Sequence, residues 1–112
     1  MKLLLLAALV LVAEAREAPT EEALVECALV RFAGGADALS LPQLSEAFGT
    51  LMAHRRWAKK IAAKGYPAAD VVWAEFASDG GMTRGDARHM MAVLDEGKHT
   101  GWLRRAIGKL WC

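Results

Sequence analysis

The sequence predicts an all-α fold with two tandem helix-loop-helix units and a C-terminal amphipathic helix. Apolar residues recur at helical spacing along most of the chain, and no alternating strand pattern of useful length occurs. Glycine-containing stops separate the helical segments. Short patterns also recur in the same order at a nearly constant offset, which indicates an internal duplication.

The N-terminus has the pattern of a secretory signal peptide. Lys2 precedes the apolar run 3–13, and Ala13 and Ala15 place small residues where a signal peptidase reads the chain. The alternative is a buried helix or a membrane anchor, but the run is well short of the roughly 20 residues that span a bilayer. We therefore predict cleavage after Ala15, a single helical domain over residues 16–112, and secretion or residence in the lumen of the secretory pathway.

The first unit spans about residues 20–65. Thr20 is a candidate N-cap, and the acids that follow it suit the positive end of a helix. The glycine pair 34–35 ends this helix. Ser40, with a glutamine three residues later, forms a capping box that opens a second helix, which we expect to continue through Ile61.

The second unit spans about residues 66–111 and repeats this plan. A helix follows the Tyr-Pro pair 66–67, and residues 78–81 break it. Thr83 begins another capping box and another helix. The final segment, 100–111, places apolar and basic residues on opposite sides of a helix.

Three matched patterns support the duplication. Leu29-x-x-Phe32 recurs as Trp73-x-x-Phe76, Leu39-Ser40 recurs as Met82-Thr83, and His54-x-x-Trp57 recurs as His99-x-x-Trp102, at offsets of 44, 43 and 45. Each unit is thus a helix, a glycine-containing loop, a capped helix and a basic tail.

Charge follows the same division. Residues 16–50 carry a net charge of −4, residues 51–66 carry +5, residues 67–97 carry −4 and residues 98–112 carry +4. The overall charge of +1 is therefore a cancellation between blocks. Such near-neutrality argues against attraction of the whole surface to nucleic acid.

The two units resemble a paired EF-hand domain. Each has a phenylalanine late in its first helix, a loop that contains aspartate, and a Leu or Met just before a Ser or Thr cap. The residues that carry the resemblance are Phe32, Asp37, Leu39, Ser40, Gln43 and Leu44 in the first unit, and Phe76, Asp79, Gly80, Met82, Thr83 and Asp86 in the second. The resemblance implies loops that bind Ca²⁺ through six to eight oxygens.

The loops depart from that family's pattern. The first has small residues at 34–36, where ligands should begin, and Gln43 replaces the final bidentate acid. The second offers Glu75, Asp79 and Asp86, which the resemblance implies as candidate calcium ligands. Because several carboxylates are missing, we expect weak calcium binding or none.

Cys27 and Cys112 are the cysteines of the chain and lie near the two ends of the predicted domain. In an oxidising compartment we predict that they form an intramolecular disulfide. The alternatives are an intermolecular bond through Cys112 and two unpaired thiols.

The C-terminal segment predicts a contact surface. One helix combines tryptophan with positive charge, a pattern suited to an anionic membrane or to a partner surface. The residues of this surface are Trp102, Arg104, Arg105, Lys109 and Trp111. Two alternatives are that the tryptophans fill the core, and that the acidic helices neutralise the basic segments.

No nucleophile elbow, metal-binding histidine pair or phosphate loop frames His54, His89 or His99. We therefore predict a small secreted binding or interaction module rather than an enzyme, with a protein or an anionic membrane as partner and no nucleic acid. The alternative function is a membrane-active, cationic protein of the host-defence kind.

Overall fold

The computed structural model describes residues 18–97 and 101–112, and it is mostly helical, which is compatible with the predicted all-α class. The predicted signal peptide and His99 lie outside the described residues. The elements are α2 (Glu21–Ala33), β1 (Ala38–Leu39), α3 (Leu41–Met52), α4 (Arg55–Ala63), α5 (Ala69–Phe76), β2 (Met82–Thr83), α6 (Arg84–Leu94) and α7 (Trp102–Trp111). Within these ranges no helix is long and apolar enough to cross a bilayer.

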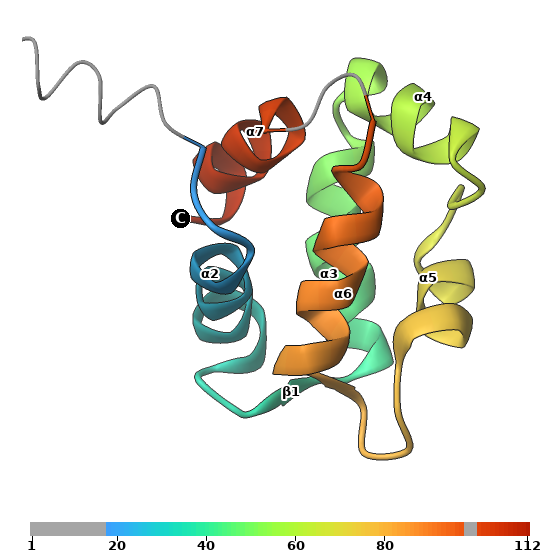
Figure 1. The fold of residues 1–112 in the computed structure, drawn as a ribbon. Helices are drawn as coiled ribbons and strands as arrows, with labels where there is room; N and C mark the ends of the chain where they lie inside the picture. Colours follow the sequence, from blue (N-terminus) through green and yellow to red (C-terminus); the bar gives the residue numbers. More distant parts are fainter. Residues whose placement is uncertain (1–17, 98–100) are drawn as a thin grey trace, which may run out of the picture.

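Helices α3 and α6 lie in the middle of the domain in Figure 1, and α2 packs against both. Helix α5 packs against α3 and α6, and α7 packs against α2 and α3. The apolar faces of these helices supply one continuous core, in which Leu24, Leu44, Met91 and Ile107 are almost fully buried. Burial of these faces is the main favourable contribution to folding.

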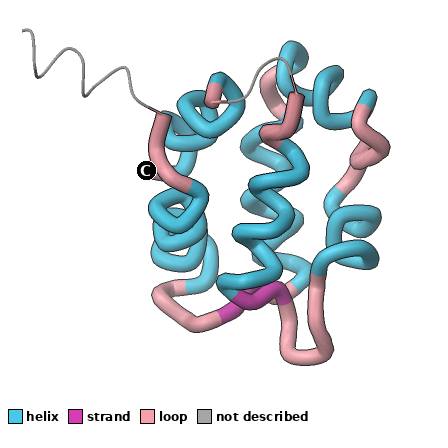
Figure 2. The backbone as a smooth tube through the Cα atoms, viewed as in Figure 1, coloured by secondary structure: helices cyan, strands magenta, loops and turns pink. Residues whose placement is uncertain are grey.

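The two loops meet at one end of the domain through a short antiparallel sheet (Figure 2). Leu39 lies opposite Met82, and both side chains are buried. Gly81 precedes β2 with a φ of 107°, and a Cβ atom there would lie 2.8 Å from the carbonyl oxygen of Leu39. Only glycine satisfies both requirements, so the second loop can approach the first closely.

The helix starts that the sequence predicts are present. The Thr20 side chain accepts a hydrogen bond from the Ala23 amide at the start of α2. Ser40 and Thr83 form reciprocal capping boxes at the starts of α3 and α6. Each box satisfies amide groups that the first helical turn leaves without partners.

The single long helix predicted from Ser40 through Ile61 is wrong, because α3 ends at Met52 and α4 begins at Arg55. His54 adopts an extended backbone between them, with φ −96° and ψ 102°. The break turns α4 so that Ile61 is fully buried while Arg55 remains at the surface. A periodicity argument cannot locate this break, because the sequence there contains neither glycine nor proline.

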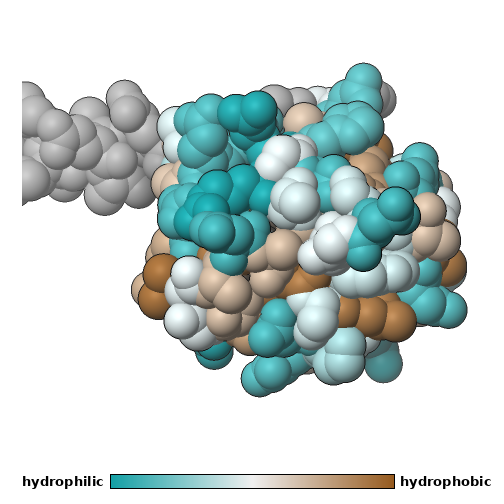
Figure 3. Space-filling view, turned by 90° about the horizontal axis from the view of Figure 1, so that it is seen from below, coloured by the Kyte–Doolittle hydropathy of each residue, from teal (hydrophilic) through white to brown (hydrophobic). Residues whose placement is uncertain are grey.

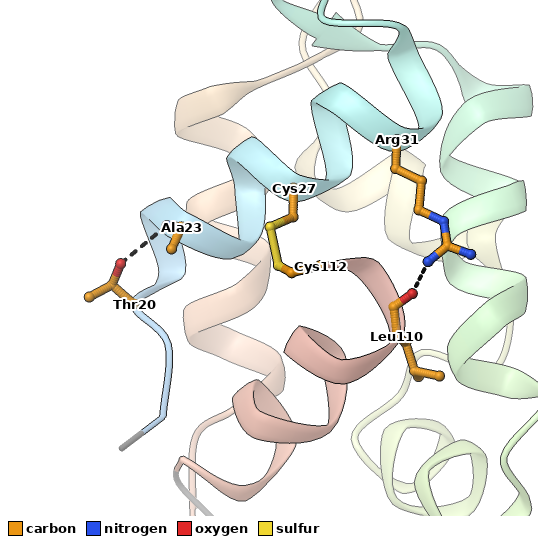
Figure 4. The surroundings of a disulfide bond; sticks show 6 residues. All are labelled: Thr20, Ala23, Cys27, Arg31, Leu110 and Cys112. Carbon is orange, nitrogen blue, oxygen red and sulfur yellow. Dashed lines mark hydrogen bonds between the residues drawn. A yellow bond between two sulfur atoms is a disulfide. The ribbon is translucent and has the colours of Figure 1, made fainter. Parts of the chain in front are cut away.

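The predicted intramolecular bridge between Cys27 and Cys112 is present and joins α2 to the end of α7 (Figure 4). The two Cα atoms are 5.3 Å apart. Beside the bridge, the Arg31 guanidinium donates a hydrogen bond to the carbonyl oxygen of Leu110. The last turn of α7 is therefore attached to α2 by a covalent bond and a polar contact.

Replacement of both Cys27 and Cys112 by serine should lower the free energy of unfolding by about 2–4 kcal/mol, because the bridge restricts a long loop in the unfolded chain. Urea unfolding followed by circular dichroism measures this loss, and the unmodified protein in reductant is the matched comparison. An unchanged unfolding midpoint in both samples would contradict the structural role of the bridge.

Candidate functional site

Two regions contain the residues that the sequence predicts to be functional. The first is the loop end, which comprises β1, β2 and the loops before them. The second is the opposite end of the domain, where α4 and α7 lie (Figure 1).

At the loop end, Asp86 is held by hydrogen bonds within the protein. Its Oδ2 atom accepts from the Ser78 amide at 3.2 Å, from the Ser78 hydroxyl at 2.8 Å and from the Thr83 amide at 3.1 Å. Burial tends to raise the pKa of this carboxyl, but the bonds from Ser78 and Thr83 outweigh burial, and the pKa is lowered. The carboxylate that the EF-hand resemblance implies as a calcium ligand therefore stabilises the loop through hydrogen bonds.

The other two candidate calcium ligands do not join Asp86. Glu75 interacts with Tyr66 instead, and this interaction is the main cause of the raised pKa of Tyr66. Asp79 lies exposed in the turn between Ser78 and Gly81. In the described ranges, no group of three or more His, Cys, Asp or Glu residues could hold a metal ion.

The first loop is closed in a similar way. The Gln43 side-chain oxygen accepts from the Ser40 amide at 2.9 Å, so it acts as a capping group. A neutral amide engaged in a cap, and a carboxylate that already accepts from Ser78 and Thr83, do not make the oxygen-rich cage that calcium requires. The residues at the loop end therefore do not fit a calcium ion.

Figure 3 shows the loop end from below: hydrophobic residues lie across the middle of this face, and hydrophilic residues lie around them.

Between α4 and α7 the surface is hollowed into what we call the basic groove, with a volume of about 890 Å³. Its chemistry combines positive charge with aromatic rings. The side chains that supply this chemistry are His54, Arg56, Trp57, Trp102, Arg105 and Lys109. The basic tails of the two sequence units therefore face a common hollow.

Lys60 lies between the two tryptophans of the groove. Its ammonium nitrogen is 5.0 Å from the ring centroid of Trp57 and 5.9 Å from that of Trp102. Arg56 adds a cation over Trp57 at 5.9 Å. These contacts hold positive charge and aromatic surface together at one place.

Two acidic residues of α2, Glu22 and Glu26, are paired elsewhere. Arg84 on α6 binds both Glu26 and Asp37, and Arg88 binds Glu22. The bond from Arg84 is the main cause of the lowered pKa of Glu26. In the described part of the chain, no ion pair links α4 to an acidic residue.

Two of the residues predicted to form the contact surface make contacts within the fold. Trp111 is 5% exposed, and its indole N–H donates to the Thr50 hydroxyl at 2.8 Å. Arg104 is paired with the buried Asp95 at 2.7 Å. Trp102, by contrast, is 47% exposed.

The role of Lys60 and the place of Arg56 in the groove were not predicted from the sequence. The signal that points to them is the +5 charge of residues 51–66, which exceeds the charge of the C-terminal block. The sequence alone could not predict that this block lies near Trp102, because the direction of α4 depends on the break at His54.

The two histidines within the described residues lie at different places in the domain. His54 lines the basic groove, and the His89 ring contacts Phe76 edge-on with the centroids 5.3 Å apart.

No family model, curated protein or solved structure matches the chain.

Replacing Asp86 by alanine should lower the free energy of unfolding by about 1 kcal/mol at neutral pH, because Ser78 and Thr83 lose their shared acceptor. The lowered folded-state pKa means that the carboxylate stabilises the protein above its unfolded pKa of about 3.9. This contribution is lost as the pH falls through the lower folded-state pKa. Urea unfolding at neutral and acidic pH measures both effects.

Glu46→Ala is the matched control, since it also removes one carboxylate from a helix but Glu46 is exposed. Equal losses of stability in the two variants would contradict the special role of Asp86.

Proposed function

We propose that this protein is a secreted, EF-hand-like helical module that binds anionic membrane surfaces through its basic groove. The observation that carries the proposal is the position of Lys60 between Trp57 and Trp102. The proposal has three parts: the architecture, the compartment and the ligand.

The EF-hand-like architecture is supported by the pairing of the loops. Leu39 and Met82, at equivalent positions of the two units, lie opposite each other in the sheet. A capped helix follows each strand. The function we propose for the loops is structural, with protein hydrogen bonds in place of a metal ion.

Secretion is supported by the Cys27–Cys112 bridge, since disulfides persist in oxidising compartments. The leader pattern of residues 1–15 supports the same compartment.

The anionic ligand is supported by the charge distribution. Within the described residues, no acidic side chain forms an ion pair with a cation of α4, and Lys109 extends this positive region on α7. Cations next to an anionic lipid surface each contribute about 1 kcal/mol of attraction. The electrostatic potential at this end of the domain therefore attracts an anionic partner.

A membrane fits this surface better than an acidic protein segment does. Indole rings prefer the boundary between head groups and acyl chains, and the exposed Trp102 lies beside the cations that head groups attract. An acidic protein would use the charge of the groove but would not need this aromatic edge.

The variant Arg56→Gln, Lys109→Gln should bind vesicles of mixed phosphatidylglycerol and phosphatidylcholine about thirtyfold more weakly, because two cations contribute about 2 kcal/mol. The variant Arg55→Gln, Lys59→Gln is the control: it removes equal charge at exposed positions of α4 that do not line the groove. We expect a loss of a few-fold at most in this control.

Co-sedimentation with the vesicles measures the affinity, and phosphatidylcholine vesicles show the contribution of lipid charge. Equal affinity for both kinds of vesicle would overturn the proposal. Binding to an acidic peptide without binding to vesicles would replace the membrane by a protein partner.

Calcium at millimolar concentration should produce neither heat in calorimetry nor a change in tryptophan emission, because Gln43 and Asp86 are engaged in caps. A saturable heat of binding that Asp86→Ala abolishes would contradict the structural role of the second loop.

A further inference from the structure

A second hollow adjoins the basic groove and has a different chemistry. This apolar pocket has a volume of about 310 Å³ and lies between α4, the end of α6 and the start of α7. Trp57, Ile61, Ala63, Leu94 and Leu103 supply its apolar lining. The volume is at the lower end of the range for small-molecule sites, roughly 300–1,000 Å³.

Two of the charged residues at this pocket already have partners. The Lys64 ammonium donates to the Leu94 carbonyl oxygen at 2.6 Å and also to that of Glu96. The buried Asp95 carboxylate accepts from the Gly101 amide at 3.0 Å and from Arg104. Since these groups are satisfied within the protein, the apolar lining determines what the pocket accepts.

The pocket and the basic groove share a wall. Trp57 lines both hollows, and Lys60 lines the pocket while its ammonium lies over Trp57 and Trp102. Glu96 is the exposed acidic residue at the pocket, and it follows the end of α6. The Lys64 ammonium offsets the charge of Glu96 on the α6 side, so Lys60 determines that a negative group is favoured on the α4 side, toward the groove.

We infer that the two hollows together bind one molecule of a single-chain anionic amphiphile, such as an alkyl phosphate. The acyl or alkyl chain occupies the apolar pocket, and the anionic head group lies at Lys60 and the basic groove. The inference rests on the proposed function, because it uses the same groove for the head group. Beyond adsorbing on a charged surface, the protein would bind the acyl or alkyl chain of an individual amphiphile.

Calorimetry with butyl, octyl and dodecyl phosphate below their micelle concentrations tests the inference on the unmodified full chain. Affinity should rise about fourfold for each added methylene until the pocket is full, because chain burial drives binding. Inorganic phosphate, which has only the charge, should bind much more weakly than octyl phosphate. Equal affinity for all three alkyl phosphates would overturn the inference.

Ala63→Phe should fill the pocket and weaken octyl phosphate binding at least tenfold. Ala62→Phe is the matched control, because Ala62 is the exposed neighbour on α4 and does not line the pocket. Equal loss in both variants would contradict the assignment of the chain to this pocket. Circular dichroism shows that each variant is folded.

Vesicle binding by the same unmodified preparation separates the inference from the proposed function. A protein that binds anionic vesicles but shows no dependence on chain length retains the proposed function and loses the inference. A protein that binds neither vesicles nor alkyl phosphates loses both.

Discussion

The attachment of α7 to α2 determines the shape of the functional end of this domain. The Cys27–Cys112 bridge and the Arg31 contact hold the last turn of α7, and Trp111 enters the core beside Phe32 with the rings 5.9 Å apart. At its other end α7 is held by Arg104 and Asp95. With both ends fixed, Trp102 and Lys109 are presented toward α4, and the basic groove follows from this placement.

The two ends of the domain use charge differently. Near the loop end, the arginines of α6 pair with the acidic residues of α2, and Asp86 serves as a capping acceptor. These charged groups therefore stabilise local structure. The exposed ion pairs contribute little to the stability of the fold, and the caps contribute more. Around α4, cations are gathered over tryptophan rings without a paired carboxylate in the described residues. The electrostatic attraction for a partner is therefore concentrated opposite the loops.

Local signals in the sequence predicted the local features of the fold. Ser40 and Thr83 locate two helix starts because a capping box is a short-range pattern, and the equivalence of Leu39 and Met82 follows from the repeat. Side-chain positions that depend on distant parts of the chain were harder to predict from the sequence. An amphipathic pattern cannot distinguish Trp111 in the core from Trp102 at the surface, because the packing of α7 on α2 and α3 decides between them. The role of Lys60 likewise depends on how α4 and α7 approach each other, which no sequence spacing predicts.

The central claim is that α4 and α7 bring two tryptophans to one lysine. Nuclear magnetic resonance tests it directly through nuclear Overhauser effects between the terminal methylene protons of Lys60 and the indole protons. We predict effects to both Trp57 and Trp102, together with upfield shifts of those methylene protons by the aromatic rings. Lysine shifts typical of an unfolded chain, with no effect to either indole, would contradict it.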